Sequence, residues 1–412
     1  SYIDALIQTG QTDAAQQVLE QGRQRGLQGE AVEALAGRLG HLENAMPDQP
    51  TELACAIAHR EAGRYKEAAL VLKSWLVSNP QDASAYALLA QVLSLDKQDE
   101  PAWVALNIAL SINPALPIVQ RNHARLLLKQ QKLDEALQAA QAAYQSDVTD
   151  PENQLVLAAA LGANNQNEQA FQLVANALQS HPNYAEAYAN RALLKLHSGD
   201  PIGALADAEK SLSIKPHLAL IWGLVSSLRY KLKNLPGAIE ALEKAIKLES
   251  DNVVYMVDLG ELLRQTGKVG AAIVLLEKAV AVAPDNVGAW VNLGTAFQQA
   301  KRIPEAKAAY AKALETAPEH TEAHLALSSI LINQKHYEAA QAVLDAVKPP
   351  NPADTENTHR LALSYAALFH AQNCWTEAEV WVRRALAIKP KEVKVLRQLG
   401  AILGEQKHYE DA

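Results

Sequence analysis

The stretch that decides the fold is GAWVNLGTAFQQAKRIPEAKAAYAKALETAPEH, residues 288–320. Apolar and small residues recur in it at helical spacing, once before the segment AKRIP and once after it. We expect one helix from about Ala289 to Ala300 and a second from about Pro304 to Thr316, because proline is tolerated in the first turn of a helix. The APEH that follows ends the second helix, since proline cannot continue it. The stretch therefore predicts a pair of helices.

The same pattern recurs every 34 residues along most of the chain. Steps of 34 from Ala306 reach an alanine each time, at Ala68, Ala102, Ala136, Ala170, Ala204, Ala238, Ala272 and Ala340. A second column holds only small residues: Ala56, Ala90, Ala124, Ala158, Ala192, Ser226, Gly260, Gly294 and Ser328. A third column holds prolines at Pro80, Pro114, Pro182, Pro216, Pro284 and Pro318. Three columns in one register predict stacked helix pairs, each of which needs its neighbours to cover its apolar surface.

The spacing within one period resembles a known repeat. The pattern W-x2-L-G-x2-Y, A-x3-F and P is matched by Trp290, Leu293, Gly294, Phe297, Ala306, Tyr310 and Pro318. The chain thus resembles the tetratricopeptide repeat (TPR) family. This resemblance implies an all-α, right-handed superhelix, or α-solenoid, of about eleven 34-residue helix-turn-helix repeats, counting partial ones. The turn inside a repeat is expected to be left-handed, as indicated by Gly63, Gly199, Gly267, Asn165 and Asn373.

The register divides the chain into four segments. Residues 1–48 hold a partial repeat and one out-of-register helix near 30–45, which either caps the array, changes its direction or remains from a decayed repeat. Residues 49–348 form a continuous array, and 349–358 form a proline-rich connection where the step lengthens from 34 to 38. Residues 359–412 hold a further repeat and a truncated last one. Both ends fall inside helical patterns, which predicts a fragment of a longer protein.

Composition excludes several classes of function. Lys and Arg number 38 against 46 Asp and Glu, so the formal charge of −8 argues against nucleic-acid binding. Two distant cysteines, Cys55 and Cys374, build no disulfide framework; they fit a reducing compartment such as the cytoplasm, or chance. No apolar run is long enough to span a membrane.

The chain also lacks the motifs of common catalytic and cofactor sites. Gly267 and Lys268 lie at a turn between helices, not in a phosphate loop. His123 falls in an apolar column and is assigned to packing in preference to metal binding, and Arg191 is expected to pair with Asp207. We therefore expect no cofactor and no enzyme activity in this segment.

The resemblance implies that the first helix of each repeat lines a concave surface that binds a protein or an extended peptide. The informative residue lies two before each small-column residue, and we call these the ladder positions: Ala54, Leu88, Asn122, Val156, Asn190, Leu224, Asp258, Asn292, Ala326, Ser364 and Gln398. Six of the eleven are polar, which is similar to the asparagine ladder of O-linked N-acetylglucosamine transferases. The alternative is an ordinary solvated face. Nearby apolar contacts are expected from Val257, Val291 and Leu325.

Two further patterns concern charge. Arg121, Arg125 and Lys129 follow one another at one-turn spacing and either hold a carboxylate or phosphate or form a solvated cationic face. Asn190 matches the asparagine of the clamp that binds chaperone tails. The other clamp positions hold Leu155, Ala159, Leu220 and Leu224, which argues against such a clamp.

Two functions remain after this search. The first is a protein-binding or peptide-binding scaffold that uses its concave groove. The second is the substrate-targeting region of a larger enzyme, such as a glycosyltransferase, whose catalytic domain lies outside this chain. The length of the parent reading frame distinguishes them.

Overall fold

The structure is a computed structural model that describes Val18, Val32, residues 52–347 and residues 354–406. The chain divides into two compact units, Ser1–Asn190 (unit 1) and Arg191–Ala412 (unit 2). The expected helix near 30–45 apart from Val32, residues 349–353 of the proline-rich connection and the final residues 407–412 lie outside the described residues.

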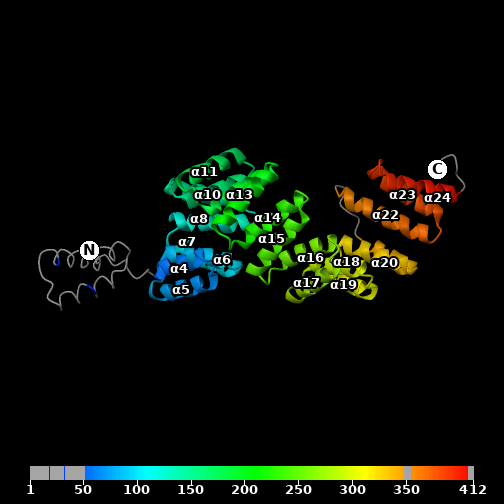
Figure 1. The fold of residues 1–412 in the computed structure, drawn as a ribbon, viewed down its shortest axis with the longest axis horizontal. Coiled ribbons are helices and arrows are strands. Elements are labelled where there is room, and N and C mark those ends of the chain that lie inside the picture. Colours follow the sequence, from blue (N-terminus) through cyan, green and yellow to red (C-terminus); the bar gives the residue numbers. More distant parts are fainter. Residues whose placement is uncertain (1–17, 19–31, 33–51, 348–353, 407–412) are drawn as a thin grey trace. The chain divides into compact units, whose positions relative to one another are not determined.

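Every regular element in residues 52–347 and 354–406 is an α-helix, as the resemblance implied (Figure 1). Unit 1 holds α4 (Glu52–Glu61), α5 (Tyr65–Ser78), α6 (Ala83–Leu95), α7 (Asp99–Ile112), α8 (Pro117–Lys129), α9 (Leu133–Ser146), α10 (Pro151–Ala163), α11 (Asn167–Ser180) and the start of α12 (Ala185–His197). Unit 2 continues with α13 (Pro201–Ile214), α14 (Ala219–Lys231), α15 (Leu235–Leu248), α16 (Val253–Gln265), α17 (Val269–Val282), α18 (Val287–Gln299), α19 (Ile303–Thr316), α20 (Thr321–Asn333), α21 (Tyr337–Asp345), α22 (Thr355–Ala371), α23 (Trp375–Ile388) and α24 (Val393–Glu405).

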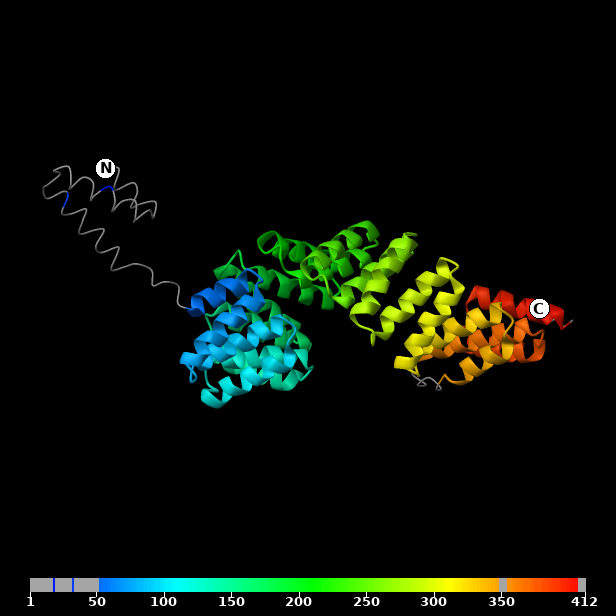
Figure 2. The same cartoon turned by 90° about the horizontal axis from the view of Figure 1, so that it is seen from below.

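The helices form pairs at the predicted period. Ten pairs run from α4–α5 to α22–α23 among the described residues, and α24 begins an eleventh. In residues 288–320, α18 and α19 begin within two residues of the predicted starts and end within one residue of the predicted ends. Short turns join the two helices of each pair, which the view of Figure 2 shows from below.

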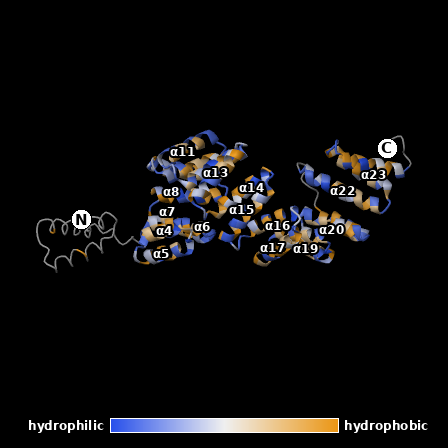
Figure 3. Cartoon of the chain, in the orientation of Figure 1, coloured by the Kyte–Doolittle hydropathy of each residue, from blue (hydrophilic) through white to orange (hydrophobic). Residues whose placement is uncertain are grey.

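The alanine column lies in the buried contacts between helices. Each of its members in the second helices has an exposed fraction of 0%: Ala68, Ala102, Ala136, Ala170, Ala204, Ala238, Ala272, Ala306, Ala340 and Ala378. The small column of the first helices is equally buried, with Ala56, Ala90, Ala124 and Ala192 at 0%. Each helix therefore turns a small, apolar face inward and leaves polar residues outside, so both hydropathy colours appear along it (Figure 3).

The turn inside each repeat is left-handed in all ten pairs. The expected Gly63, Gly199, Gly267, Asn165 and Asn373 have φ between 60° and 81°. The same conformation occurs at residues without that preference: Lys97, Gln131, Lys233, Lys301 and Lys335. A Schellman hydrogen-bond pair stabilises it, in which Lys268 N–H donates to Leu263 O at 2.8 Å and Gly267 N–H donates to Arg264 O at 3.1 Å.

Stacking continues across the longer step near residue 350. α22 begins at Thr355, so the last four residues assigned to the connection are helical. One apolar cluster joins α20, α21 and α22, with Leu331, Leu344 and Leu368 in its buried part. The repeat after the 38-residue step therefore packs on the repeat before it.

We predict that Gly294→Ala lowers the free energy of unfolding by about 1–3 kcal/mol, because overpacking distorts a filled core. A Cβ at this position would lie 2.6 Å from Cε1 of Tyr310, whose exposed fraction is 0%. The matched control is Gly270→Ala, where no atom lies within 4 Å of the added Cβ. It should leave the free energy unchanged or raise it by up to about 1 kcal/mol. Urea unfolding followed by circular dichroism measures both, and equal stability of the two variants would contradict the packing argument.

Candidate functional site

The first helices of neighbouring repeats contact one another directly, as α6 with α8, α8 with α10, α16 with α18 and α20 with α22. In Figure 1 the helices α16, α18 and α20 follow one another in a row, with α17 and α19 beside them. We call this surface the first-helix face and describe it separately in each unit. The ladder positions belong to these helices, so the face is where the sequence places its candidate binding residues.

In unit 1 the first-helix face carries a network of ion pairs. Arg121 Nη1 lies 2.6 Å from Asp150 Oδ2 and donates to Asn153 Oδ1 at 3.0 Å. Glu152 Oε2 lies 3.2 Å from Arg121 Nε and 3.1 Å from Arg125 Nη2. Both cations are therefore already paired with acids from the next repeat.

The network extends across four repeats of unit 1. Arg60 of α4 places Nη2 3.8 Å from Glu152 Oε1 of α10, and its Nη1 donates to Gln91 Oε1 of α6 at 2.9 Å. Glu152 thus lies among three arginines from α4 and α8. These residues fill the first-helix face of unit 1 with the protein's own charges.

The electrostatics keep this network ionised at neutral pH. Burial by itself would raise the pKa of the Glu152 carboxyl, but Arg125, Arg121 and Arg60 together hold it below its usual value. Burial lowers the pKa of the Arg125 guanidinium, and the Glu152 carboxylate opposes that shift. A carboxylate or phosphate ligand would have to displace Glu152 or Asp150 to reach Arg121 or Arg125.

Asn122 is a structural residue of this face and not an exposed one. Its exposed fraction is 1%, its Nδ2 donates to Ala87 O of the preceding repeat at 2.8 Å, and its Oδ1 accepts from Arg125 at 3.0 Å. Lys129 is likewise bound to the preceding repeat, at 2.9 Å from Ser94 O and 2.7 Å from Asp99. The interpretation of Asn122 as an exposed groove position is wrong, because its amide links two repeats.

The expected roles of two other residues agree with the structure. Arg191 donates to both carboxylate oxygens of Asp207 at 2.8 and 2.6 Å, and Lys195 pairs with the same group at 2.7 Å. Burial would raise the pKa of Asp207, but these two cations lower it overall. His123 packs edge-on against Trp103, with ring centroids 6.0 Å apart, and burial lowers its pKa.

Unit 2 presents a different first-helix face, which contains a hollow between α14 and α16. We call it the α14–α16 hollow; its volume is about 290 Å³. It is lined by Ser226, Ser227, Tyr230, Leu242, Asp258, Glu261, Leu262 and Gln265. Asp258 is exposed and makes no hydrogen bond or ion pair with any described residue, and desolvation by the surrounding protein atoms raises the pKa of its carboxyl. Glu261, by contrast, accepts from Arg264 at 2.8 and 2.6 Å.

The other polar ladder residues are half-buried and differ in their partners. Asn190 donates to Glu186 O of its own helix at 3.0 Å, and Ser364 donates to Arg360 O at 3.1 Å. The side chains of Asn292 and Gln398 form no hydrogen bond within the described part of the chain. Unit 2 thus brings unpaired ladder groups, Asp258 and Asn292, onto neighbouring first helices.

Two of the three apolar residues expected on the first-helix face of unit 2 are not accessible there. Val291 and Leu325 are 4% and 6% exposed and belong to the core, whereas Val257 is half-buried. The exposed apolar groups on α14 and α16 include Leu220 at 73% and Val254 at 61%. Each lies four residues before a ladder position, one turn earlier on the same helix face, and this spacing was the signal that could have identified them.

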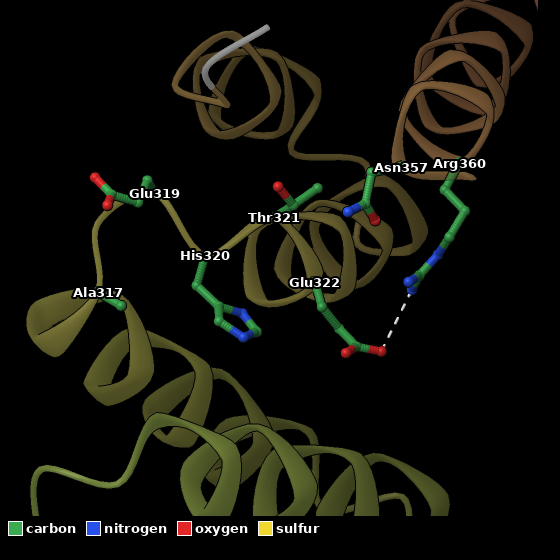
Figure 4. A pocket seen from close by; sticks show the side chains of 7 residues that line it. All are labelled: Ala317, Glu319, His320, Thr321, Glu322, Asn357 and Arg360. Carbon is green, nitrogen blue, oxygen red and sulfur yellow. Dashed lines mark hydrogen bonds and ion pairs between the residues drawn. The ribbon is translucent and has the colours of Figure 1, made fainter. Parts of the chain in front are cut away.

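A second hollow of unit 2, of about 380 Å³, lies at the amino ends of α20 and α22 (Figure 4). Its lining consists of Ala317, Glu319, His320, Thr321, Glu322, Asn357 and Arg360. Arg360 Nη2 lies 3.4 Å from Glu322 Oε1, and His320 Nδ1 accepts from Ala323 N–H at 3.3 Å. No pattern in the sequence indicated this hollow, which forms beside the lengthened step. Glu322 and Arg360, two of its charged groups, are paired with each other.

Antiparallel helix pairs repeated at one period define an α-helical repeat protein. A family model described as "Tetratricopeptide repeat" matches residues 229–296, 263–311 and 297–362. Residues 229–362 are therefore tetratricopeptide repeats, as the sequence pattern predicted, and the described helix pairs outside this range follow the same period.

Three known proteins are similar to this chain over different lengths. The human protein O-mannosyl-transferase TMTC1 is 26% identical over 195 residues, which cover 43% of this chain and 22% of that protein. The Cut9–Hcn1 crystal structure, an APC/C hetero-tetramer, is 15% identical with a TM-score of 0.54, covering 97% of this chain and 82% of that one. YrrB, titled a TPR protein with an unusual peptide-binding site, is 20% identical with a TM-score of 0.40, covering 45% and 96%. The chain spans only 22% of the length of its curated relative.

No helix in the described ranges is both long enough and apolar enough to cross a membrane.

We predict that two ladder asparagines affect stability differently. Asn122→Ala should lower the free energy of unfolding by about 1–3 kcal/mol, because it removes two hydrogen bonds of a buried amide, one to Ala87 O and one from Arg125. Asn292→Ala removes no hydrogen bond within the described residues and should change it by less than about 0.5 kcal/mol. Thermal and urea unfolding of both variants provide the comparison. Equal losses would show that Asn292 also has a structural role.

We also predict a loss of stability at acid pH that depends on Glu152. The pKa of Glu152 is lower in the folded chain than its usual value of about 4.3. At a pH between these two pKa values, the unfolded chain therefore binds more protons than the folded chain. The contribution of the ionised Glu152 carboxylate to the free energy of unfolding is therefore complete above about pH 4.3, and it is lost as the pH falls through the depressed pKa.

Glu152→Gln should be less stable at pH 7 and should show a shallower decline below about pH 4.3. The matched control is Glu67→Gln, at an exposed position in unit 1. Unfolding measured from pH 7 to pH 2 compares them. If the unfolding free energies of Glu152→Gln and the parent chain changed with pH in parallel, Glu152 would not be the group responsible for the loss of stability at acid pH.

Proposed function

We propose that this chain binds an extended segment of a partner protein along the first-helix face of unit 2. The observation that carries the proposal is the contrast between the two faces. In unit 1 the polar groups Arg121, Arg125 and Asn122 are satisfied by the protein itself. In unit 2 Asp258 and Asn292 have no partner among the described residues, and Leu220 and Val254 are exposed one turn before ladder positions of α14 and α16.

An extended peptide fits the chemistry of this face. Its backbone carries one donor and one acceptor per residue, and the amide of Asn292 can both accept and donate. Its apolar side chains would cover Leu220 and Val254, which otherwise remain in water. Binding, and not catalysis, is therefore the role we assign to this segment.

A second function has specific support from one of the relatives. The similarity to TMTC1, which is named a protein O-mannosyl-transferase, favours the role of a substrate-targeting region in a larger glycosyltransferase. The two proposals share the same binding face and differ in the consequence of binding. A parent reading frame that encodes a glycosyltransferase domain favours targeting, and one that encodes only further helices favours a scaffold.

The proposal predicts that Val254→Ser lowers the affinity for a bound peptide by about tenfold, because a buried valine contributes about 1.5 kcal/mol. The matched control is Val274→Ser on the second helix α17, where the valine is 69% exposed. The peptides are selected from a random library displayed on phage and then synthesised for calorimetry. Equal affinities of the Val254→Ser and Val274→Ser variants would place the binding site elsewhere.

A further inference from the structure

The α14–α16 hollow combines a cavity with two polar groups that lack partners. Asp258 comes from α16, and Ser226 comes from the facing side of α14. Ser226 is only 3% exposed, yet its hydroxyl makes no hydrogen bond with any described residue. Asp258 is exposed, and neither side chain has a partner among the described residues, so a ligand that supplies hydrogen-bond donors can bind both without displacing a protein group.

The charge of the hollow is negative because its other charges are paired. Arg264 neutralises Glu261 through two hydrogen bonds, at 2.8 and 2.6 Å. On the neighbouring helices, Arg229 pairs with Glu209 at 2.9 Å, and Lys244 pairs with Glu240 at 2.7 Å. Asp258 therefore remains as the uncompensated charge among these groups.

The remaining lining suits the stem of a long cationic side chain. Tyr230 is 45% exposed at the edge of the hollow and offers an aromatic ring, which attracts cations. Leu262 and Leu242 supply apolar walls for methylene groups. Val254 lies one turn before Asp258 on α16, about 6 Å along the helix axis, within reach of a neighbouring residue of the same peptide.

We propose that the α14–α16 hollow binds a lysine or arginine side chain of the partner segment, with the cationic group on Asp258 and Ser226 accepting a further hydrogen bond. This inference rests on the function proposed above and adds the chemical class of the recognised residue. The negatively charged hollow selects a basic peptide and disfavours an acidic one.

The experiment begins with a random twelve-residue peptide library displayed on phage and selected on the full chain. The selected peptides should carry a lysine or arginine. One such peptide is then synthesised in two forms, with its cationic residue retained or replaced by glutamine. Calorimetry measures the affinity of both peptides for three proteins: the parent chain, Asp258→Asn and the control Asp285→Asn. The control makes the same charge change in the exposed turn before α18.

The parent chain should bind the cationic peptide about tenfold more tightly than the glutamine form, as expected for a hydrogen-bonded charge. Asp258→Asn should remove that preference, whereas Asp285→Asn should retain it. Higher salt should reduce the preference in the parent chain, because screening weakens partly exposed charges. Circular dichroism verifies that each variant is folded.

Three outcomes would overturn the inference. Equal binding of both peptide forms, or a preference that persists in Asp258→Asn, shows that the hollow does not recognise a cation. If such peptides still depend on Val254, the proposed function stands without the cation. If the library yields no peptide at all, both the function and the inference are contradicted.

Discussion

Close contact between helices at a column of alanines is the constraint on which the rest of this structure depends. All ten second-helix alanines, from Ala68 to Ala378, are completely buried. A larger side chain there would force the helices of a repeat apart, because filled cores do not absorb added volume without strain. Since the helices of each repeat pack on those of the adjacent repeats, the same distance must be kept at every step. The spacing of alanines therefore fixes which helices meet, and with that it brings the first helices together on one face.

Once the first helices are neighbours, the polar groups on their shared face need partners. Unit 1 meets this need internally, since Glu152 lies among Arg60, Arg121 and Arg125. Unit 2 does not, because Asp258 has no partner in the described residues. The same repeat thus supports a face whose charges pair with one another in unit 1 and a face with unpaired polar groups in unit 2. The difference comes from a few side chains and not from the helices themselves.

The period made the helix pairs predictable, because it records backbone packing directly. It also places every left-handed turn, including those at Lys97 and Lys301 where the residue type carries no signal. The pairs that side chains form with one another were harder to predict from the sequence. Arg191 and Asp207 lie in one repeat and could be paired by register, whereas Arg60 and Glu152 belong to repeats three apart. Their contact depends on how the repeats stack in space, and one sequence does not contain that geometry.

The two faces also set different conditions for a ligand. An acidic segment that reached Arg121 in unit 1 would have to displace Asp150 at 2.6 Å and would leave that carboxylate unpaired. A basic segment that reached Asp258 in unit 2 would displace no protein group and would supply an interaction partner to an exposed carboxylate that has none among the described residues. Although unit 1 has the more prominent cations in the sequence, a ligand there must break existing ion pairs, whereas a ligand at Asp258 breaks none. Under the proposed function, the availability of a charged group, and not the number of charged groups on the face, is therefore what selects the partner.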